Sequence, residues 1–479
     1  MTLLNLRDMI HQEAYQQHQA QRCTQIQQHF FPEDKTFISI LSMHGHDYTI
    51  AAIRIEGSRV GTNTFICTDP RSYDELTVIY TQIARVLLPF IQSYQNTDRF
   101  PVFVFPNHTS IELLRRAGEV MRRKSMPHIV RELGTFIAFL YKHAHKEGQL
   151  IVVDMIKCVD QHYVLLHSTG HIGMAKAQLR GANDMPRLIA NMESEEMNAG
   201  GAEIKASDDI DLADILGPYS KAKKNNDAAA IQSISTKLNA LYSPILEYQI
   251  QTMQWIVKFI QSDRLDPNND YLEYCRQEER ISFHGRSDNG GVFDQHGSIQ
   301  GFHKYPQYET TTQNTLTLIS RENHLQKLHF KKLQWDRYTR LEEKRRGKLI
   351  DCVVTQSNKD NQYRFQIEVS QPVVHIREGD TLHHLYTKTW SARVLSMQIT
   401  PTNSRIIDLQ MTKGMRNSFP QVADSLLLCK EKPFSPKISN FSRRLRLAPQ
   451  THFRRDTLHS SDLPTVQQNT LLQYLKDLK

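Results

Sequence analysis

The segment Tyr363-Arg364-Phe365-Gln366-Ile367-Glu368-Val369-Ser370 alternates apolar and polar residues at every position. Side chains of a β-strand point to opposite faces in turn, so this alternation predicts a strand with one buried face. Other short apolar segments surround it, at residues 349–354, 373–376, 390–399 and 407–411. Five or six short strands within about 65 residues are typical of a small barrel of the OB or SH3 type, which we expect over residues 348–415.

Within residues 390–399 the apolar positions change register. Trp390, Ala392 and Val394 occupy even positions, and Leu395 and Met397 then take over at odd positions. One extra residue in a strand produces such a shift, so we expect a β-bulge near residue 395.

A helix precedes the predicted barrel. Leu325, Leu328, Leu333 and Leu341 recur among charged residues at helical spacing, which predicts one long stalk helix over residues 321–347. Gly347 follows the last helical residues, at the position where glycine commonly ends a helix.

The charge of the chain is concentrated in its C-terminal third. The 479 residues carry 59 Lys and Arg against 51 Asp and Glu, a net charge of +8. Residues 331–479 hold 26 basic and 14 acidic residues (+12), so residues 1–330 hold 33 and 37 (−4). Such an asymmetry predicts that the basic third contacts a polyanion, most simply single-stranded nucleic acid, RNA or DNA. A solvated basic surface without a partner is the alternative.

Arginine and lysine pair with phosphates, and aromatic rings offer a stacking surface for bases. On this basis we select the residues of a candidate nucleic-acid interface. They are Lys331, Lys332, Trp335, Arg337, Arg340, Arg345, Arg346, Lys348, Arg443, Arg444 and Arg446.

A basic helix that leads into a small barrel resembles the stalk and inserted barrel of superfamily 1 helicases of the nonsense-mediated-decay and immunoglobulin-mu-binding type. In that family a return segment and a RecA-like motor domain follow, and the motor opens with a Q motif, Leu-x-x-x-Gln-x-x-Ala. Leu463 and Gln467 match this motif, while Thr470 replaces its alanine. The resemblance implies a return segment at 416–460 and the start of a motor domain at 461–479, with Gln467 reading the adenine of ATP.

The sequence departs from the family at the phosphate-binding loop. No Gly-x-x-x-x-Gly-Lys-Ser/Thr occurs, and the sequence ends at Lys479, about where that loop would begin. We therefore expect a helicase portion or subunit without its motor, which is not an ATPase on its own. ATP and Mg²⁺ would act only with a motor chain or domain as partner.

The N-terminal side predicts a mixed α/β domain at 36–190. Three strands, a helix, a strand at 101–105 and a second helix follow one another, an order that resembles a ribonuclease H-like module over residues 36–120. His108 and Glu112 fit its second acidic motif, but Ile38-Ser39-Ile40-Leu41-Ser42 lacks the carboxylate that two-metal catalysis needs. We expect no catalytic residues and treat Asp154 as a surface residue; a metal-dependent nuclease and a protein-binding adaptor remain alternatives.

Together these elements predict an α+β multidomain chain. Its other predicted parts are an N-terminal helix (1–35), an acidic mobile loop (191–227), a helical segment that Pro244 divides in two (228–265) and a loop-rich linker (266–320).

Six dispersed cysteines predict reduced thiols rather than a zinc site, and His284, His296 and His303 read as loop residues, so no metal is expected. No apolar run of about 18 residues and no leader is found, which predicts a cytoplasmic protein without a membrane partner.

Overall fold

The computed structural model describes residues 6–17, 19–43, 46–69, 72–164, 172, 175–176, 178–179, 213–263, 270–286, 289–290, 292–293, 299, 311–360, 362–387, 390–401, 404–414 and 419–430. The chain divides into two units, Met1–His303 with Leu325–Phe434, and Lys304–His324 with Ser435–Lys479. Every contact reported below lies within the first unit. None of the described helices has the length and apolar character needed to cross a bilayer.

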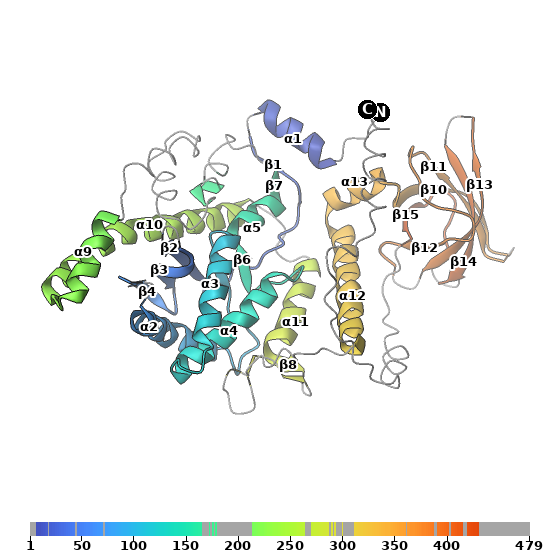
Figure 1. Ribbon diagram of the computed structural model, residues 1–479. Coiled ribbons are helices and arrows are strands. Elements are labelled where there is room, and N and C mark those ends of the chain that lie inside the picture. The colour runs from blue at the N-terminus through green and yellow to red at the C-terminus, as the bar shows by residue number, and fades with distance from the viewer. Residues whose placement is uncertain are drawn as a thin grey trace, which may run out of the picture. The chain divides into compact units, whose positions relative to one another are not determined.

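A five-stranded mixed sheet forms the centre of the N-terminal part (Figure 1). Its strand order is β4-β3-β2-β5-β6, with β2, β3 and β4 antiparallel and β5 and β6 parallel to β2. The strands are β2 (Thr36–Met43), β3 (His46–Gly57), β4 (Gly61–Ile66), β5 (Phe103–Phe105) and β6 (Val152–Asp154). This confirms the predicted order of three strands, helix, strand and helix. Phe105 lies beside Asp154, so β5 and β6 end at the same edge of the sheet.

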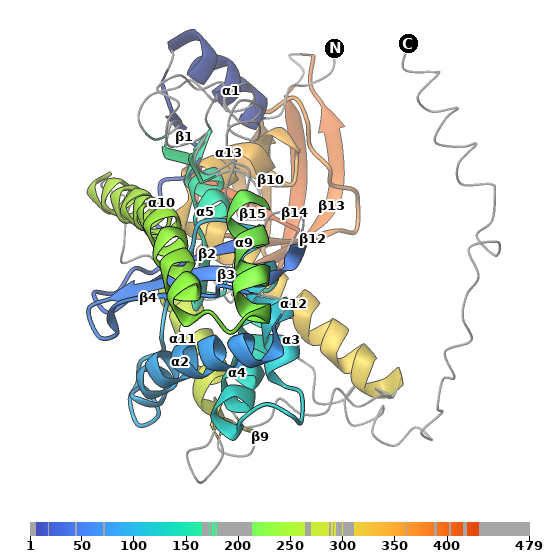
Figure 2. The ribbon, with the colours of Figure 1, turned by 60° about the vertical axis from the view of Figure 1, so that its left-hand side comes forward.

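Helices cover both faces of this sheet (Figure 2). The face toward α10 (Ala228–Ser262) receives Ser39, which bonds Gln249, and Leu41, which packs among the apolar residues of α10. Side chains alternate along β2, so the neighbouring Ile38 and Ile40 point to the opposite face. Three helices pack there: α2 (Tyr73–Gln92), α3 (His108–Met121) and α4 (His128–Ala144).

The sequence predicts that Pro244 breaks or kinks residues 228–265 into two helices, but one helix spans this region. Helix α10 continues through Pro244, although proline lacks the N–H that an interior helical position donates. Leu238 and Tyr242 before the proline, and Ile245 and Leu246 after it, are buried in one cluster. Burial on both sides of Pro244 offsets the lost hydrogen bond and keeps the helix continuous.

Three other expectations about this part need correction. The N-terminal helix α1 (Leu6–Gln17) ends well before residue 35, and β1 (Gln21–Arg22) then pairs with β7 (Tyr163–Val164). The region expected to be an acidic loop contains α9 (Ala213–Lys224), while residues 191–212 lie outside the described part. The expected linker contains α11 (Asp270–His284), whose Tyr271, Leu272, Cys275 and Phe283 are buried, and a short hairpin of β8 (Gly285–Arg286) and β9 (Asn289–Gly290).

The predicted single stalk helix is two helices, α12 (Thr311–Trp335) and α13 (Arg337–Arg345). The buried Asp336 separates them because its carboxylate caps α13, accepting hydrogen bonds from the Thr339 amide (3.2 Å) and hydroxyl (2.6 Å). Gly347 ends α13 as predicted: its φ is +69°, and the amides of Gly347 and Lys348 donate to the carbonyls of Lys344 and Glu343.

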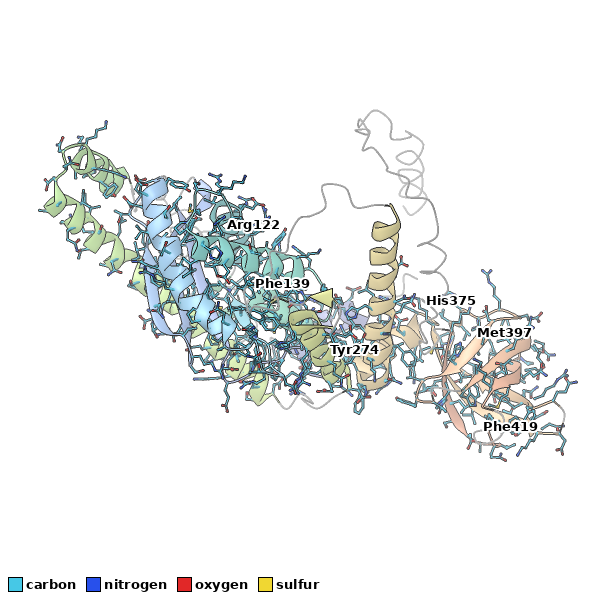
Figure 3. All side chains as sticks on the ribbon, turned by 90° about the horizontal axis from the view of Figure 1, so that it is seen from below. Arg122, Phe139, Tyr274, His375, Met397 and Phe419 are labelled. Carbon is cyan, nitrogen blue, oxygen red and sulfur yellow. The ribbon has the colours of Figure 1, made fainter. Side chains whose placement is uncertain are left out.

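A closed barrel of six antiparallel strands follows, in the order β10-β11-β14-β13-β12-β15. The strands are β10 (Leu349–Asn358), β11 (Arg364–Val369), β12 (Thr381–His384), β13 (Ser391–Ile399), β14 (Arg405–Lys413) and β15 (Ser425–Cys429). Phe365, Ile367 and Val369 are buried in its core. Met397 of β13 and Phe419, which precedes β15, pack against that core (Figure 3).

The barrel and the bulge in β13, between Val394 and Ser396, are confirmed. The boundary at residue 415 was wrong, because β15 closes the barrel from the segment that was expected to be the return path.

Candidate functional site

The two lysines predicted to bind nucleic acid on α12 make contacts within the protein. Lys331 Nζ lies 3.0 Å from a carboxylate oxygen of Asp270, and Lys332 Nζ lies 3.6 Å from one of Glu147. Lys332 also lies over the ring of Tyr271, 5.3 Å from its centroid. Both lysines therefore hold α12 against the α/β part and are poorly placed to meet a phosphate.

The residues at the junction of α12 and α13 have mixed roles. Arg340 donates to the carbonyls of Leu333 (3.2 Å) and Gln334 (2.9 Å), so it satisfies the end of α12. Trp335 exposes 37% of its surface, while its carbonyl accepts from the Gln25 amide group. Arg337 lies exposed on the first turn of α13.

The C-terminal end of α13 presents two exposed cations of the predicted set. The Arg346 and Lys348 side chains are 55% and 57% exposed. Arg346 pairs with Glu342 (2.9 Å) and with Glu343 (3.3 Å), and Lys348 lies 3.9 Å from Glu343. Arg346 and Lys348 thus share one buried carboxylate, that of Glu343, and each cation keeps N–H groups that face solvent. Arg345 precedes them and contacts Met9 of α1.

A groove of about 460 Å³ runs between α13 and the α/β part. Its cationic lining includes Arg7, Lys332 and Arg346, and Tyr338 adds an aromatic ring. Four carboxylates also line it: Asp160, Asp336, Glu342 and Glu343. These acids offset the positive charge of the groove, so it is not a basic surface.

The outer wall of the barrel adds two cations that the composition did not single out. Arg364 on β11, Gln410 on β14 and Arg393 on β13 are neighbours across the sheet, and both arginines are exposed. In the adjacent row Gln366 and Ser396 donate to Asp408 (3.0 and 2.6 Å). The alternation of 363–370 and 390–394 already placed both arginines on the outer face, so this signal was present in the sequence.

The remaining predicted residues, Arg443, Arg444, Arg446 and Gln467, lie outside the described residues. The interface and the adenine contact assigned to them therefore stay predictions.

A polar cavity of about 390 Å³ lies where β5 and β6 end, and its lining includes His108, His145, Asp154 and Lys157. Asp154 is not an ordinary surface residue as expected: it caps α5 (Met155–His162) through the Lys157 amide, and burial raises the pKa of its carboxyl. The rings of His108 and His145 are 5.6 Å apart. The carboxyl edge of parallel strands commonly holds ligands.

The described residues do not assemble the carboxylates of a two-metal nuclease. Glu112 accepts hydrogen bonds from Tyr141 (2.6 Å) and Arg115 (2.8 Å). Burial raises the pKa of Glu112, but these hydrogen bonds outweigh it and leave the pKa below its ordinary value. Among the described residues, the one group of three or more potential metal ligands is His29, Cys158 and His162. Of the three histidines expected in loops, His284 is the last residue of α11 and makes a hydrogen bond of 2.7 Å with the carbonyl of Arg99. His296 and His303 lie outside the described residues.

Sequence and structure comparisons identify no relative of this chain. No protein-family model, curated protein or solved structure matches it.

Proposed function

We propose that this chain binds single-stranded nucleic acid through the end of α13 and the adjoining barrel, as the motor-less part of a superfamily 1 helicase. The observation that supports this most is the closed barrel that follows directly on α13, with the basic residues Arg345 and Arg346 at the end of that helix and Lys348 between Gly347 and β10. Exposed guanidinium and ammonium groups on a rigid element are suited to track a phosphate backbone.

The outer row of Arg364, Gln410 and Arg393 supports a second contact region on the barrel. Nucleic-acid binding by this surface would resemble other small barrels, which use a strand face for single strands. Lys331, Lys332 and Arg340 are withdrawn from the interface because their cationic groups hold helices together.

Fluorescence anisotropy of labelled single-stranded RNA and DNA tests the proposal. Arg345→Glu with Arg346→Glu should weaken binding and flatten its salt dependence. Each phosphate contact on a single strand contributes a log–log slope of about −0.7, so losing both contacts should reduce the slope by about 1.4. Lys237→Glu with Lys258→Glu on the exposed face of α10 is the matched control, with the same change in charge.

Three outcomes would redirect the assignment. If both double variants weaken nucleic-acid binding equally, the change in binding would follow from the net charge of the protein and not from the end of α13. Binding of a protein partner that is insensitive to salt would favour the adaptor. We infer an inactive ribonuclease H-like module for residues 36–120. If the protein cleaves nucleic acid in the presence of Mg²⁺, and Glu112→Gln abolishes this cleavage, the result would favour an active nuclease instead. Because residues 1–479 contain no Gly-x-x-x-x-Gly-Lys-Ser/Thr loop, we expect no ATP hydrolysis by these residues alone.

A further inference from the structure

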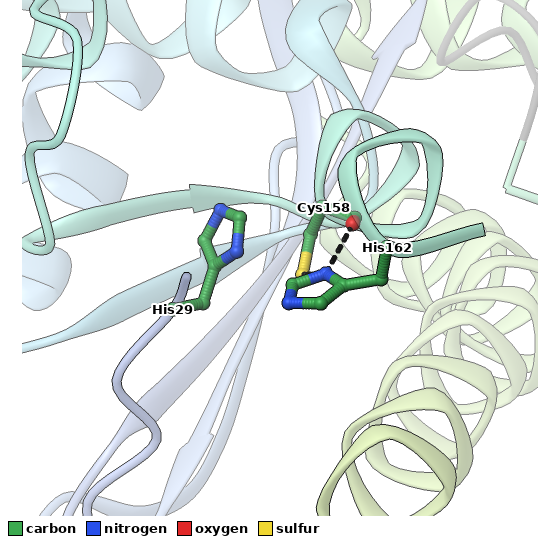
Figure 4. Close-up of side chains that lie close together, drawn as sticks. All are labelled: His29, Cys158 and His162. Carbon is green, nitrogen blue, oxygen red and sulfur yellow. Dashed lines mark hydrogen bonds between the residues drawn. The ribbon is translucent and has the colours of Figure 1, made fainter. Parts of the chain in front are cut away.

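A buried cluster of three potential ligands lies beside the sheet-edge cavity (Figure 4). Cys158 and His162 are four residues apart on α5, so their side chains project from one side of the helix. His29 comes from the segment after β1, and its ring faces the sulfur of Cys158 and the ring of His162 (Figure 4). Cys158 and His162 form a Cys-x-x-x-His spacing, which differs from the closely spaced cysteine pairs by which a zinc site is usually predicted from sequence.

The hydrogen bonds of the cluster engage both nitrogens of His162 and leave Nδ1 of His29 without a partner, so a metal at Nε2 of His162 would replace the long bond from Gln28. His162 Nδ1 donates to the Cys158 carbonyl at 2.8 Å, a bond that fixes the neutral tautomer with a lone pair on Nε2. Histidine ligands of metals commonly make this type of bond with their second nitrogen. Nε2 accepts one long hydrogen bond, 3.3 Å from the Gln28 amide. His29 Nδ1 is buried without a hydrogen-bond partner, and an unsatisfied buried polar atom costs free energy.

The distances suit a small cation after a modest contraction. One ligand atom from each residue lies within 4.8 Å of the others, so the three atoms lie at most about 2.8 Å from a common centre. Zinc binds nitrogen at about 2.0–2.1 Å and sulfur at about 2.3 Å, so each atom needs to move by roughly 0.5–0.8 Å. Imidazole and thiolate are the ligands that zinc prefers.

We propose that His29, Cys158 and His162 form a Zn²⁺ site, with a water molecule from the adjoining cavity as the fourth ligand. Binding forms a Zn–S bond and releases the thiol proton of Cys158 to solvent. The two histidines bind as neutral groups and lose no proton. His29 lines the cavity, so the fourth position faces a space of about 390 Å³.

Metal analysis of the full-length protein tests this site. We expect one equivalent of Zn²⁺ by elemental analysis, and after chelation and Co²⁺ loading a thiolate-to-cobalt charge-transfer band in the near ultraviolet. Cys158→Ser should abolish the band and lower the affinity by more than the about 10- to 100-fold typical of changes next to metal ligands. His29→Gln should shift the visible cobalt spectrum and weaken binding.

Cys352→Ser is the matched control, since it removes a buried thiol of the barrel and should leave both spectra unchanged. Circular dichroism of each variant separates ligand loss from misfolding. Wild-type protein that binds no metal at one equivalent, or a cobalt band that survives in folded Cys158→Ser, would overturn the proposal. Azide should perturb the wild-type cobalt spectrum if the fourth position holds water; an unchanged spectrum would contradict that assignment.

Discussion

Asp336 joins three segments through one buried carboxylate. It begins α13 by accepting from Thr339, and its other oxygen accepts from the Gln25 amide at 3.0 Å. It therefore sets the break between α12 and α13 and also holds the N-terminal segment against them. In the sequence, Asp336 is one acidic residue within a basic helix. Its contact with Gln25 could not be predicted, because the two residues are more than 300 positions apart.

Replacing Asp336 by alanine should lower the free energy of unfolding by about 2–5 kcal/mol. Loss of the cap accounts for about 1–2 kcal/mol, and the unpaired Gln25 amide adds about 1–3 kcal/mol. Asp227→Ala removes the exposed N-cap of α10 alone and should cost about 1 kcal/mol. Urea denaturation measures both, and equal costs would show that the contact with Gln25 contributes nothing.

The buried pair of His143 and Glu279 predicts a pH dependence of stability. Burial raises the pKa of Glu279, but the charge and hydrogen bond of His143 outweigh it and hold the pKa below its ordinary 4.5. The ionised carboxylate also accepts from the Leu150 amide at 2.7 Å. A lowered folded-state pKa means that this stabilisation is present above pH 4.5 and is lost as the pH falls through the folded value.

Glu279→Gln should therefore destabilise the protein at neutral pH, and its deficit relative to wild type should shrink below pH 4.5. Urea midpoints measured from pH 7 to pH 3.5 check this. Glu119→Gln, whose carboxylate is exposed, is the control. A deficit for Glu279→Gln that is constant across the range would show that the pair does not titrate as described.

At the scale of elements, α3 and α4 approach each other closely at two glycines. A Cβ atom on Gly118 would lie 2.7 Å from Cγ2 of Ile137, and one on Gly134 would lie 2.8 Å from Cβ of Met121. Neither distance is tolerated, so glycine at these positions sets the separation of the two helices.

Gly118→Ala should lower the free energy of unfolding by about 1–3 kcal/mol through overpacking, even though alanine favours a helix by up to about 1 kcal/mol. Combining it with Ile137→Ala should cost less than the sum of the single changes, because the shortened side chain makes room. A double-mutant cycle in urea measures this coupling, and strict additivity would contradict the close contact.

The sequence correctly predicted elements whose formation depends on residues close together in the chain. The strict alternation of 363–370 identified the barrel wall, and Gly347 identified a helix end. The helix boundary predicted at Pro244 is absent, because Leu238 and Leu246 are buried on either side of the proline and hold α10 together. Helix α11 was missed because breakers flank it, although Tyr271, Cys275 and Phe283 carry its buried face at helical spacing.

At the scale of the whole first unit, α12 rests against the turn before β6. Gly148 has a φ of +71°, and a Cβ there would lie 2.8 Å from Leu328. Lys332 pairs with the neighbouring Glu147. Counting charges along the sequence could not show that Lys331 and Lys332 are neutralised, because their partners come from distant segments.

Gly148→Ala should loosen α12 from the α/β part and accelerate amide exchange over residues 325–335. Gly61→Ala is the matched control: its φ is +68°, but no atom lies within 4 Å of the added Cβ. Both changes carry a backbone cost of about 1–2 kcal/mol, so the close contacts of the added Cβ with Leu328 (2.8 Å) and with the sulfur of Cys275 (3.2 Å) distinguish them. Equal exchange rates in α12 for the two variants would contradict this account of docking.

The pairing of β10 with β15 sets Leu349 directly opposite Cys429. The polypeptide thus enters and leaves the barrel through neighbouring positions, about 5 Å apart at their Cα atoms. Because the first and last strands of the barrel are neighbours, evolution can lengthen, replace or remove the barrel without altering the course of the preceding helices. Homologous chains that keep the sheet and α12 but carry a different module between positions 348 and 430 would be the expected trace of such exchange.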